Sequence, residues 1–194
     1  TGGVELSEVG RVYPSVASVN LSAIARNLAV LRAASPTTIQ MAIVKANAYG
    51  HGLIPVALAS LKAGAQWLGV AQLAEALELR AGLDEAGIAR KDAPIFAWIS
   101  AMGTDFTAAI EADIDLSVSW TWVLDEICAA ARALGRPARV HVKIDTGMSR
   151  AGSTLADLPE LAQALREAQD QGLIEVVGAW SHMSRADDPS PSGE

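Results

Sequence analysis

The chain has 194 residues, a formal net charge of −7 and a pI near 4.9. This acidic balance excludes a basic surface for nucleic acid, and no apolar run reaches the roughly 18 residues that cross a membrane. The start of the chain lacks a signal segment, and the single Cys128, interpreted as a small buried residue, cannot form an internal disulfide. We therefore expect a cytoplasmic protein, without nucleic-acid or membrane partners, whose 51% hydrophobic residues build one sizeable core.

Residues 1–36 form the first part of the predicted organisation, with a polar lead, a short strand and a helix. Residues 16–19 alternate in polarity as a strand does. Asn20 or Ser22 can cap a helix that runs to about Ala34, and Pro36 stops it.

Residues 37–194 alternate short β-branched runs with helical patterns. The expected strands are residues 39–44, 67–70, 94–99, 114–119, 139–145 and 174–180. The expected helices are residues 53–63, 73–81, 104–111, 120–134 and 157–171. Glycines stand where C-terminal helix caps belong, at Gly64, Gly82, Gly135 and Gly172. This alternation predicts parallel strands joined by right-handed crossovers.

A barrel is favoured over an open doubly wound sheet, which would give the same units. The chemically reactive residues follow several strands, as is typical of a barrel, and no G-x-G-x-x-G fingerprint opens the first crossover. A complete barrel has eight βα units in roughly 250 residues. The predicted fold is therefore α/β, a (β/α)8 TIM-like barrel that is incomplete in this chain, with about six βα units and a loop-like tail at residues 187–194.

The string MAIVKANAYGHG, residues 41–52, places Lys45 at the end of the first barrel strand. Neighbours can lower the pKa of a lysine in such a position, which makes its amine nucleophilic enough for Schiff-base chemistry. Tyr49 and His51 add hydrogen-bond donors at the same rim. Small residues let the backbone approach a bound anion closely, at Ala46, Ala48, Gly50 and Gly52. By position alone, a solvated surface lysine is the favoured interpretation of Lys45.

The expected strand at residues 139–145 carries ionisable side chains on one face. His141, Lys143 and Asp145 alternate with apolar residues, so they should point into the barrel while the apolar residues pack under the outer helices. Buried ionisable groups must be paired or functional, which leaves either a structural ion-pair network or a reactive site. Arg150 follows this strand, and His182 follows the next one.

Three strings in this chain resemble alanine racemases: MAIVKANAYGHG, HVKIDTGMSRAG, and GAWSHM with the ADD that follows it. The resemblance departs from the family at Ser149, where glycine is common, and at Ala151, where leucine is common. It spans most of the chain, and the lysine string is its specific part. It implies a pyridoxal 5'-phosphate enzyme on a TIM-like barrel, with no metal.

The resemblance also implies roles for single residues. Lys45 would carry the cofactor as a Schiff base and later serve as one acid/base. Tyr49 would reach the phosphate and His51 would lie near the cofactor. Arg150 would contact the phenolic oxygen, oriented by a carbamylated Lys143. His182 would contact the pyridine ring. An unmodified, structural Lys143 remains an alternative.

The implied reaction is the interconversion of L-alanine and D-alanine for the cell wall, in a homodimer. Such a racemase needs a second acid/base, which in this family is a tyrosine of the partner's C-terminal β domain; Tyr13 and Tyr49 do not fit that role. That domain is expected to be absent from this chain, so the chain alone should be inactive. The alternatives are a racemase of serine or of broader range, a non-catalytic pyridoxal-phosphate-binding barrel, which Lys143 with Arg150 argues against, and an inactive folding fragment. The tryptophans are interpreted as core or interface filler.

Overall fold

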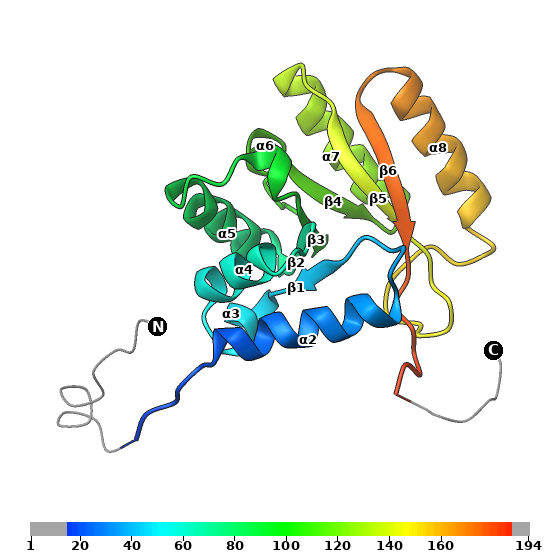
Figure 1. Cartoon of the computed structure of the whole chain (residues 1–194). Coiled ribbons are helices and arrows are strands. Elements are labelled where there is room, and N and C mark those ends of the chain that lie inside the picture. The colour runs from blue at the N-terminus through cyan, green and yellow to red at the C-terminus, as the bar shows by residue number, and fades with distance from the viewer. Residues whose placement is uncertain (1–14, 188–194) are drawn as a thin grey trace.

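The structure, a computed structural model, describes residues 15–187, and its centre is a curved sheet of six parallel strands (Figure 1). The strands pair in chain order: β1 (Met41–Ile43), β2 (Trp67–Gln72), β3 (Ile95–Ile99), β4 (Ile114–Val118), β5 (Ala138–Lys143) and β6 (Ile174–Trp180). The predicted incomplete TIM-like barrel is therefore confirmed, with six parallel strands and helices after the first five of them within residues 15–187.

Helices connect the strands; all but the short α3, which directly follows β1, lie along the outer side of this sheet, and α2 runs beside β1 (Figure 1). They are α2 (Leu21–Ala34), α3 (Lys45–Tyr49), α4 (Leu53–Lys62), α5 (Leu73–Glu85), α6 (Phe106–Glu111), α7 (Thr121–Leu134) and α8 (Leu158–Asp170), with a 3-10 turn η1 (Arg90–Asp92) before β3. The side chain of Asn20 accepts a hydrogen bond from Ala23 N at 3.2 Å and caps α2, as predicted.

The expected strand at residues 16–19 is wrong, because residues 15–20 have no regular structure. Val16 and Val19 are exposed, and no described strand pairs with this segment. Alternating polarity does not make a strand when no neighbour accepts its backbone hydrogen bonds. The polar lead up to residue 14, which includes Tyr13, and residues 188–194 of the expected tail lie outside the described residues.

One of the predicted helix caps is also wrong. Gly82 lies inside α5, where a Cβ would sit 2.3 Å from Cδ1 of Ile54, so this glycine permits close packing of α4 on α5. The residue with positive φ after α5 is Gly87, at 74°. The other three predicted glycines follow helices with positive φ: Gly64, Gly135 and Gly172.

The two faces of the sheet differ in chemistry because side chains alternate along each strand. The outer face is apolar and fully buried under the helices, with Ile95, Leu116 and Val140 all at most 2% exposed. The inner face carries aromatic and polar residues, namely Phe96, Trp98, Asp115, Ser117, His141 and Lys143. The hydrophobic core therefore lies between sheet and helices, and the interior of the barrel is left for chemistry.

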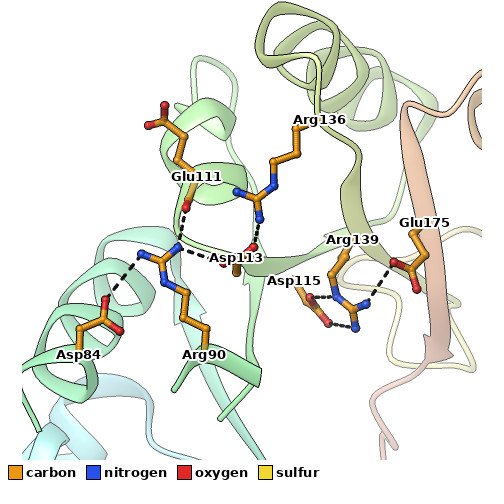
Figure 2. A network of polar contacts seen from close by, with 8 residues as sticks. All are labelled: Asp84, Arg90, Glu111, Asp113, Asp115, Arg136, Arg139 and Glu175. Atoms are coloured by element: carbon orange, nitrogen blue, oxygen red, sulfur yellow. Dashed lines mark hydrogen bonds and ion pairs between the residues drawn. The ribbon is translucent and has the colours of Figure 1, made fainter. Parts of the chain in front are cut away.

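Asp115 is the centre of a polar network near the starts of β4, β5 and β6 (Figure 2). Its buried carboxylate accepts hydrogen bonds from Arg139 Nε at 2.8 Å and contacts His141 Nε2 at 3.1 Å. Arg139 also pairs with Glu175 at 3.2 Å. The hydrogen bond that Arg139 donates to Asp115 raises the pKa of Arg139. His141 thus has a carboxylate partner, as the alternative of a paired network requires.

A second ion-pair group lies close by and fixes the turn before β4. Arg90 donates to the carbonyl of Glu111 at 2.7 Å and pairs with Asp113 at 3.0 Å, and Arg136 pairs with the same carboxylate (Figure 2). Both groups lie near the amino-terminal ends of the strands. In a parallel barrel this end serves stability, and the opposite end holds the chemistry.

Candidate active site

A cavity of about 660 Å³ lies on the inner side of the sheet and is lined by both β1 and β6. Four side chains with predicted cofactor roles line it: Lys45, Tyr49, Arg150 and His182. They come from three segments that follow β1, β5 and β6. Residues far apart in the sequence therefore meet at one end of the barrel, where parallel strands finish.

Lys45 begins its own segment, two residues after β1 ends at Ile43. Its Nζ atom lies 5.7 Å from the ring centroid of Trp98 and 5.9 Å from that of Tyr49. The side chain is half-buried between these rings. Lys45 is therefore a lysine of the cavity wall, and a fully solvated surface lysine does not describe it.

The backbone after Lys45 forms a left-handed turn. Ala46, Asn47, Ala48 and Tyr49 have φ values between 51° and 56°. This conformation costs an L-residue about 1–2 kcal/mol, so a run of such residues persists only where the surroundings hold it. Part of the support is local, because the side chain of Asn47 accepts from Leu53 N at 2.7 Å and joins the turn to α4.

Tyr49 and His51 lie at the end of this turn and just after it. Tyr49 is 60% exposed and lines the 660 Å³ cavity. The ring Nδ1 of His51 contacts the carbonyl of Ala48 at 2.9 Å, and His51 lines a neighbouring cavity beneath α2. Tyr49 lines that neighbouring cavity as well, so the two side chains share one cavity, and the expectation that His51 adds a donor at the same rim stays a prediction.

Lys143 is the most buried of the predicted site residues, at 5% exposure. Its Nζ atom lies 4.5 Å from the ring centroid of Trp180, on the inner face of the sheet. Burial lowers the pKa of Lys143 and the charge of Arg150 lowers it further, while Asp145 opposes the shift. No carboxylate within residues 15–187 forms an ion pair with this amine.

Lys143 and Arg150 also meet Lys45 around a smaller cavity of about 320 Å³. Three cationic side chains thus converge on one space, together with the buried Ser117 and Ser119. Within the described residues no hydrogen bond joins Lys143 to Arg150, as expected for two cations. The arrangement favours an anionic group between them.

The prediction that Asp145 points into the barrel is wrong. β5 ends at Lys143, and Oδ1 of Asp145 accepts hydrogen bonds from Gly147 N and Ser149 N, both at 3.0 Å. These hydrogen bonds from Ser149 and Gly147 lower the pKa of Asp145. Its carboxylate therefore shapes the loop that carries Arg150, because strand alternation no longer applies beyond the end of the strand.

The tryptophans are the residues that sequence reasoning missed. Trp67, Trp98 and Trp180 line the 660 Å³ cavity, so they are not simple filler. The rings of Trp98 and Trp180 lie 6.2 Å apart, and Trp180 Nε1 donates to Ser117 Oγ at 3.0 Å. Alternation could have found Trp98, which shares the parity of the inner residue Phe96.

Residues 19–194 match the family described as alanine racemase, N-terminal domain. The chain belongs to the alanine racemase family. It is 52% identical over 176 residues to an alanine racemase of Beutenbergia cavernae, covering 91% of this chain and 45% of that protein. It is 48% identical over 183 residues to one of Frankia casuarinae, covering 94% of this chain and 46% of that protein.

Solved structures of alanine racemases have the same fold as this chain. The enzyme from a D-cycloserine-producing Streptomyces lavendulae superposes with a TM-score of 0.82 at 49% identity, covering 88% of this chain and 43% of that one. The enzyme of Streptomyces coelicolor gives 0.84 at 45% identity, covering 89% and 45%. The chain spans about half the length of the alanine racemases it matches.

Two further properties concern residues 15–187. They contain no helix that is long and apolar enough to cross a membrane. They also contain no group of three or more His, Cys, Asp or Glu side chains arranged to hold a metal ion. Cys128 is buried in α7, where burial raises the pKa of its thiol.

Proposed function

We propose that the protein containing this chain interconverts L-alanine and D-alanine with pyridoxal 5'-phosphate bound in the 660 Å³ cavity. The observation that carries the proposal is that Lys45, Tyr49, Arg150 and His182 line this one cavity. Membership of the alanine racemase family supports the same reaction. The activity is that of proteins about twice as long as this chain, so it is proposed for the whole polypeptide.

The four cavity side chains fit pyridoxal 5'-phosphate. Lys45 offers an amine that can bond to the cofactor aldehyde, and Tyr49 offers a hydroxyl for the phosphate. Arg150 offers hydrogen bonds for the phenolic oxygen, and His182 offers a ring beside the pyridine. The cavity has the volume usual for small-molecule sites, which is about 300–1,000 Å³. When bound, the cofactor supplies the electron withdrawal that makes the α-proton of an amino acid removable.

We propose that Lys45 moves that proton. Once its amine is free, it can take a proton from the substrate α-carbon or return one on the face it occupies. The rings of Trp98 and Tyr49 limit where its Nζ atom can move. The opposite face needs a second acid/base, for which we propose a tyrosine of the other subunit in a homodimer.

Lys143 is proposed to be carbamylated. Its lowered pKa increases the fraction of neutral amine, and this form adds to CO2, forming a nitrogen–carbon bond and releasing one proton. The product is an anion. It would convert the repulsion between Lys143 and Arg150 into an ion pair that holds the guanidinium toward the cofactor.

A cytoplasmic location and a supply of D-alanine to peptidoglycan complete the proposal. Both follow from the proposed reaction and from the family. Alanine is the proposed substrate, and the other candidate, a racemase of serine or of broader range, would use the same cavity residues. The assay below therefore includes serine.

The test is to incubate the native protein with pyridoxal 5'-phosphate and L-alanine and to measure D-alanine by chiral chromatography. D-alanine should form faster than D-serine does from L-serine. Lys45→Ala should abolish the reaction, and Lys62→Ala, which removes an exposed lysine of α4, should leave it unchanged. Cofactor binding without any D-isomer would contradict the proposal and indicate a non-catalytic binding protein.

A further inference from the structure

Glu75 is a residue of α5 that joins the Lys45 segment to the end of β2. Its Oε1 atom accepts a hydrogen bond from Ala46 N at 2.6 Å. Its Oε2 atom accepts hydrogen bonds from Ala71 N and Gln72 N, both at 3.0 Å. One carboxylate therefore receives three backbone N–H groups from two neighbouring strand exits.

The hydrogen bond to Ala46 lies at the start of the left-handed turn. Ala46 is the first residue with positive φ, and its amide belongs to the peptide group that follows Lys45. Fixing this amide fixes the orientation of that peptide group, and so the direction in which the Lys45 side chain leaves the backbone. The same turn ends at Tyr49, whose ring faces the Lys45 amine at 5.9 Å.

We infer that Glu75 is a positioning residue, which holds the left-handed turn so that Lys45 and Tyr49 both face the cavity. The inference rests on the proposed function, because it concerns the placement of the cofactor lysine. The charge of Glu75 suits the task, since both carboxylate oxygens are acceptors and each faces N–H donors on a different segment.

Glutamine cannot replace this carboxylate. It has one acceptor oxygen and one NH2 group. The NH2 group would therefore face a backbone N–H donor, either that of Ala46 or those of Ala71 and Gln72, and no hydrogen bond could form there. Aspartate keeps the charge, but it is one methylene shorter and cannot reach both segments. Glu75→Gln and Glu75→Asp are therefore expected to release the turn while the helix remains.

Glu75 has a second, purely structural role that the experiment must separate. It is the third residue of α5 and forms a capping box with Gln72, whose side chain accepts from the backbone of Glu75. Gln72→Ala removes that side-chain cap and leaves the hydrogen bond to Ala46 intact. It is therefore the matched control, and Glu78→Gln changes an exposed glutamate on the same helix.

The experiment compares these variants of the native protein in three measurements. Amide hydrogen exchange of residues 46–49 and the rate at which N-hydroxysuccinimidyl acetate labels Lys45 are measured without cofactor. Affinity for pyridoxal 5'-phosphate is measured by absorbance. Both Glu75 variants should exchange these amides about tenfold faster, bind the cofactor about tenfold more weakly and label Lys45 at a changed rate, whereas Gln72→Ala and Glu78→Gln should behave as the wild type does in all three measurements.

Two results would overturn the inference. One is exchange and labelling in the Glu75 variants equal to those of Gln72→Ala. The other is a loss of cofactor affinity in Gln72→Ala as large as in the Glu75 variants, which would make the role structural. If the wild type neither binds the cofactor nor racemises alanine, the proposed function fails, and the exchange and labelling results still decide the role of Glu75.

Discussion

Lys143 shows how single residues of this site are set by their surroundings. It is a cation at 5% exposure with a second cation nearby, and its pKa is lowered by burial and by Arg150. A group in such surroundings destabilises the folded protein while it is charged. An ordinary apolar residue of similar size would be more stable there, so the position of Lys143 indicates function.

The free energy of unfolding should therefore depend on pH through Lys143. The unfolded chain holds the proton up to the ordinary lysine pKa of 10.5, whereas the folded protein loses it at lower pH. The unfolded state thus binds more protons in this window, and stability rises with pH. In CO2-free buffer the wild type should gain stability relative to Lys143→Met as the pH rises toward 10.5, the ordinary lysine pKa, measured by urea unfolding. A difference that is constant over this range would contradict the expectation.

Arg150 is expected to act on turnover rather than on the fold. Its side chain is exposed on the loop after β5 and lines both cavities. Arg150→Ala should reduce kcat by about 100-fold with little change in Tm. Arg166→Ala, which removes an exposed arginine of α8, is the control and should change neither. A large loss of stability in Arg150→Ala would show a structural role instead.

At the scale of elements, the loops after β1 and β5 are fixed by the backbone as much as by side chains. The loop after β5 returns to its own strand, where Ser153 N donates to the carbonyl of Lys143 at 2.8 Å. Gly152 makes this return possible. Its φ is 123°, and a Cβ there would lie 2.7 Å from the backbone nitrogen of Asp145.

Gly152→Ala should therefore destabilise the protein by about 3 kcal/mol and displace the loop that carries Arg150. Gly103→Ala is the control, because Gly103 also has positive φ, at 78°, but open space around its Cβ position. It should cost about 1 kcal/mol. Thermal unfolding of both variants checks the difference, and equal costs would show that the close approach at Gly152 is unimportant.

The loops after β1 and β5 are examples of what the sequence alone does not predict. The apolar run before Lys45 predicts β1, and the string around it predicts the role of Lys45, because both are patterns of neighbouring residues. The left-handed turn depends on Glu75, which is 29 residues from Ala46, and no local pattern reveals its handedness. The pairing of His141 with Asp115 likewise needs the register of β4 and β5. The expected strand at residues 16–19 failed for the same reason, since pairing is not local.

At the scale of the whole molecule, the strand order brings both edges of the sheet to the same cavity. β1 contributes Met41 and Ile43, and β6 contributes Ala179 and Trp180. The amino-terminal ends of the strands hold Asp115 with Arg139 and Glu175, while Lys45, Arg150 and His182 follow the carboxyl-terminal ends, and His141 both contacts Asp115 and lines the cavity. The division matches the barrel rule that separates stability from chemistry. Lys45 follows the carboxyl-terminal end of β1 and is the proposed cofactor lysine.

The proposal that Lys45 binds the cofactor can be tested directly. The cofactor-loaded native protein is reduced with borohydride, and the modified peptide is mapped by mass spectrometry. Lys45 lies at the rim of the cavity, between the Trp98 and Tyr49 rings, so the pyridoxyl phosphate label should be on the peptide that contains Lys45. A label found only on Lys143 or on Lys62 would contradict the account.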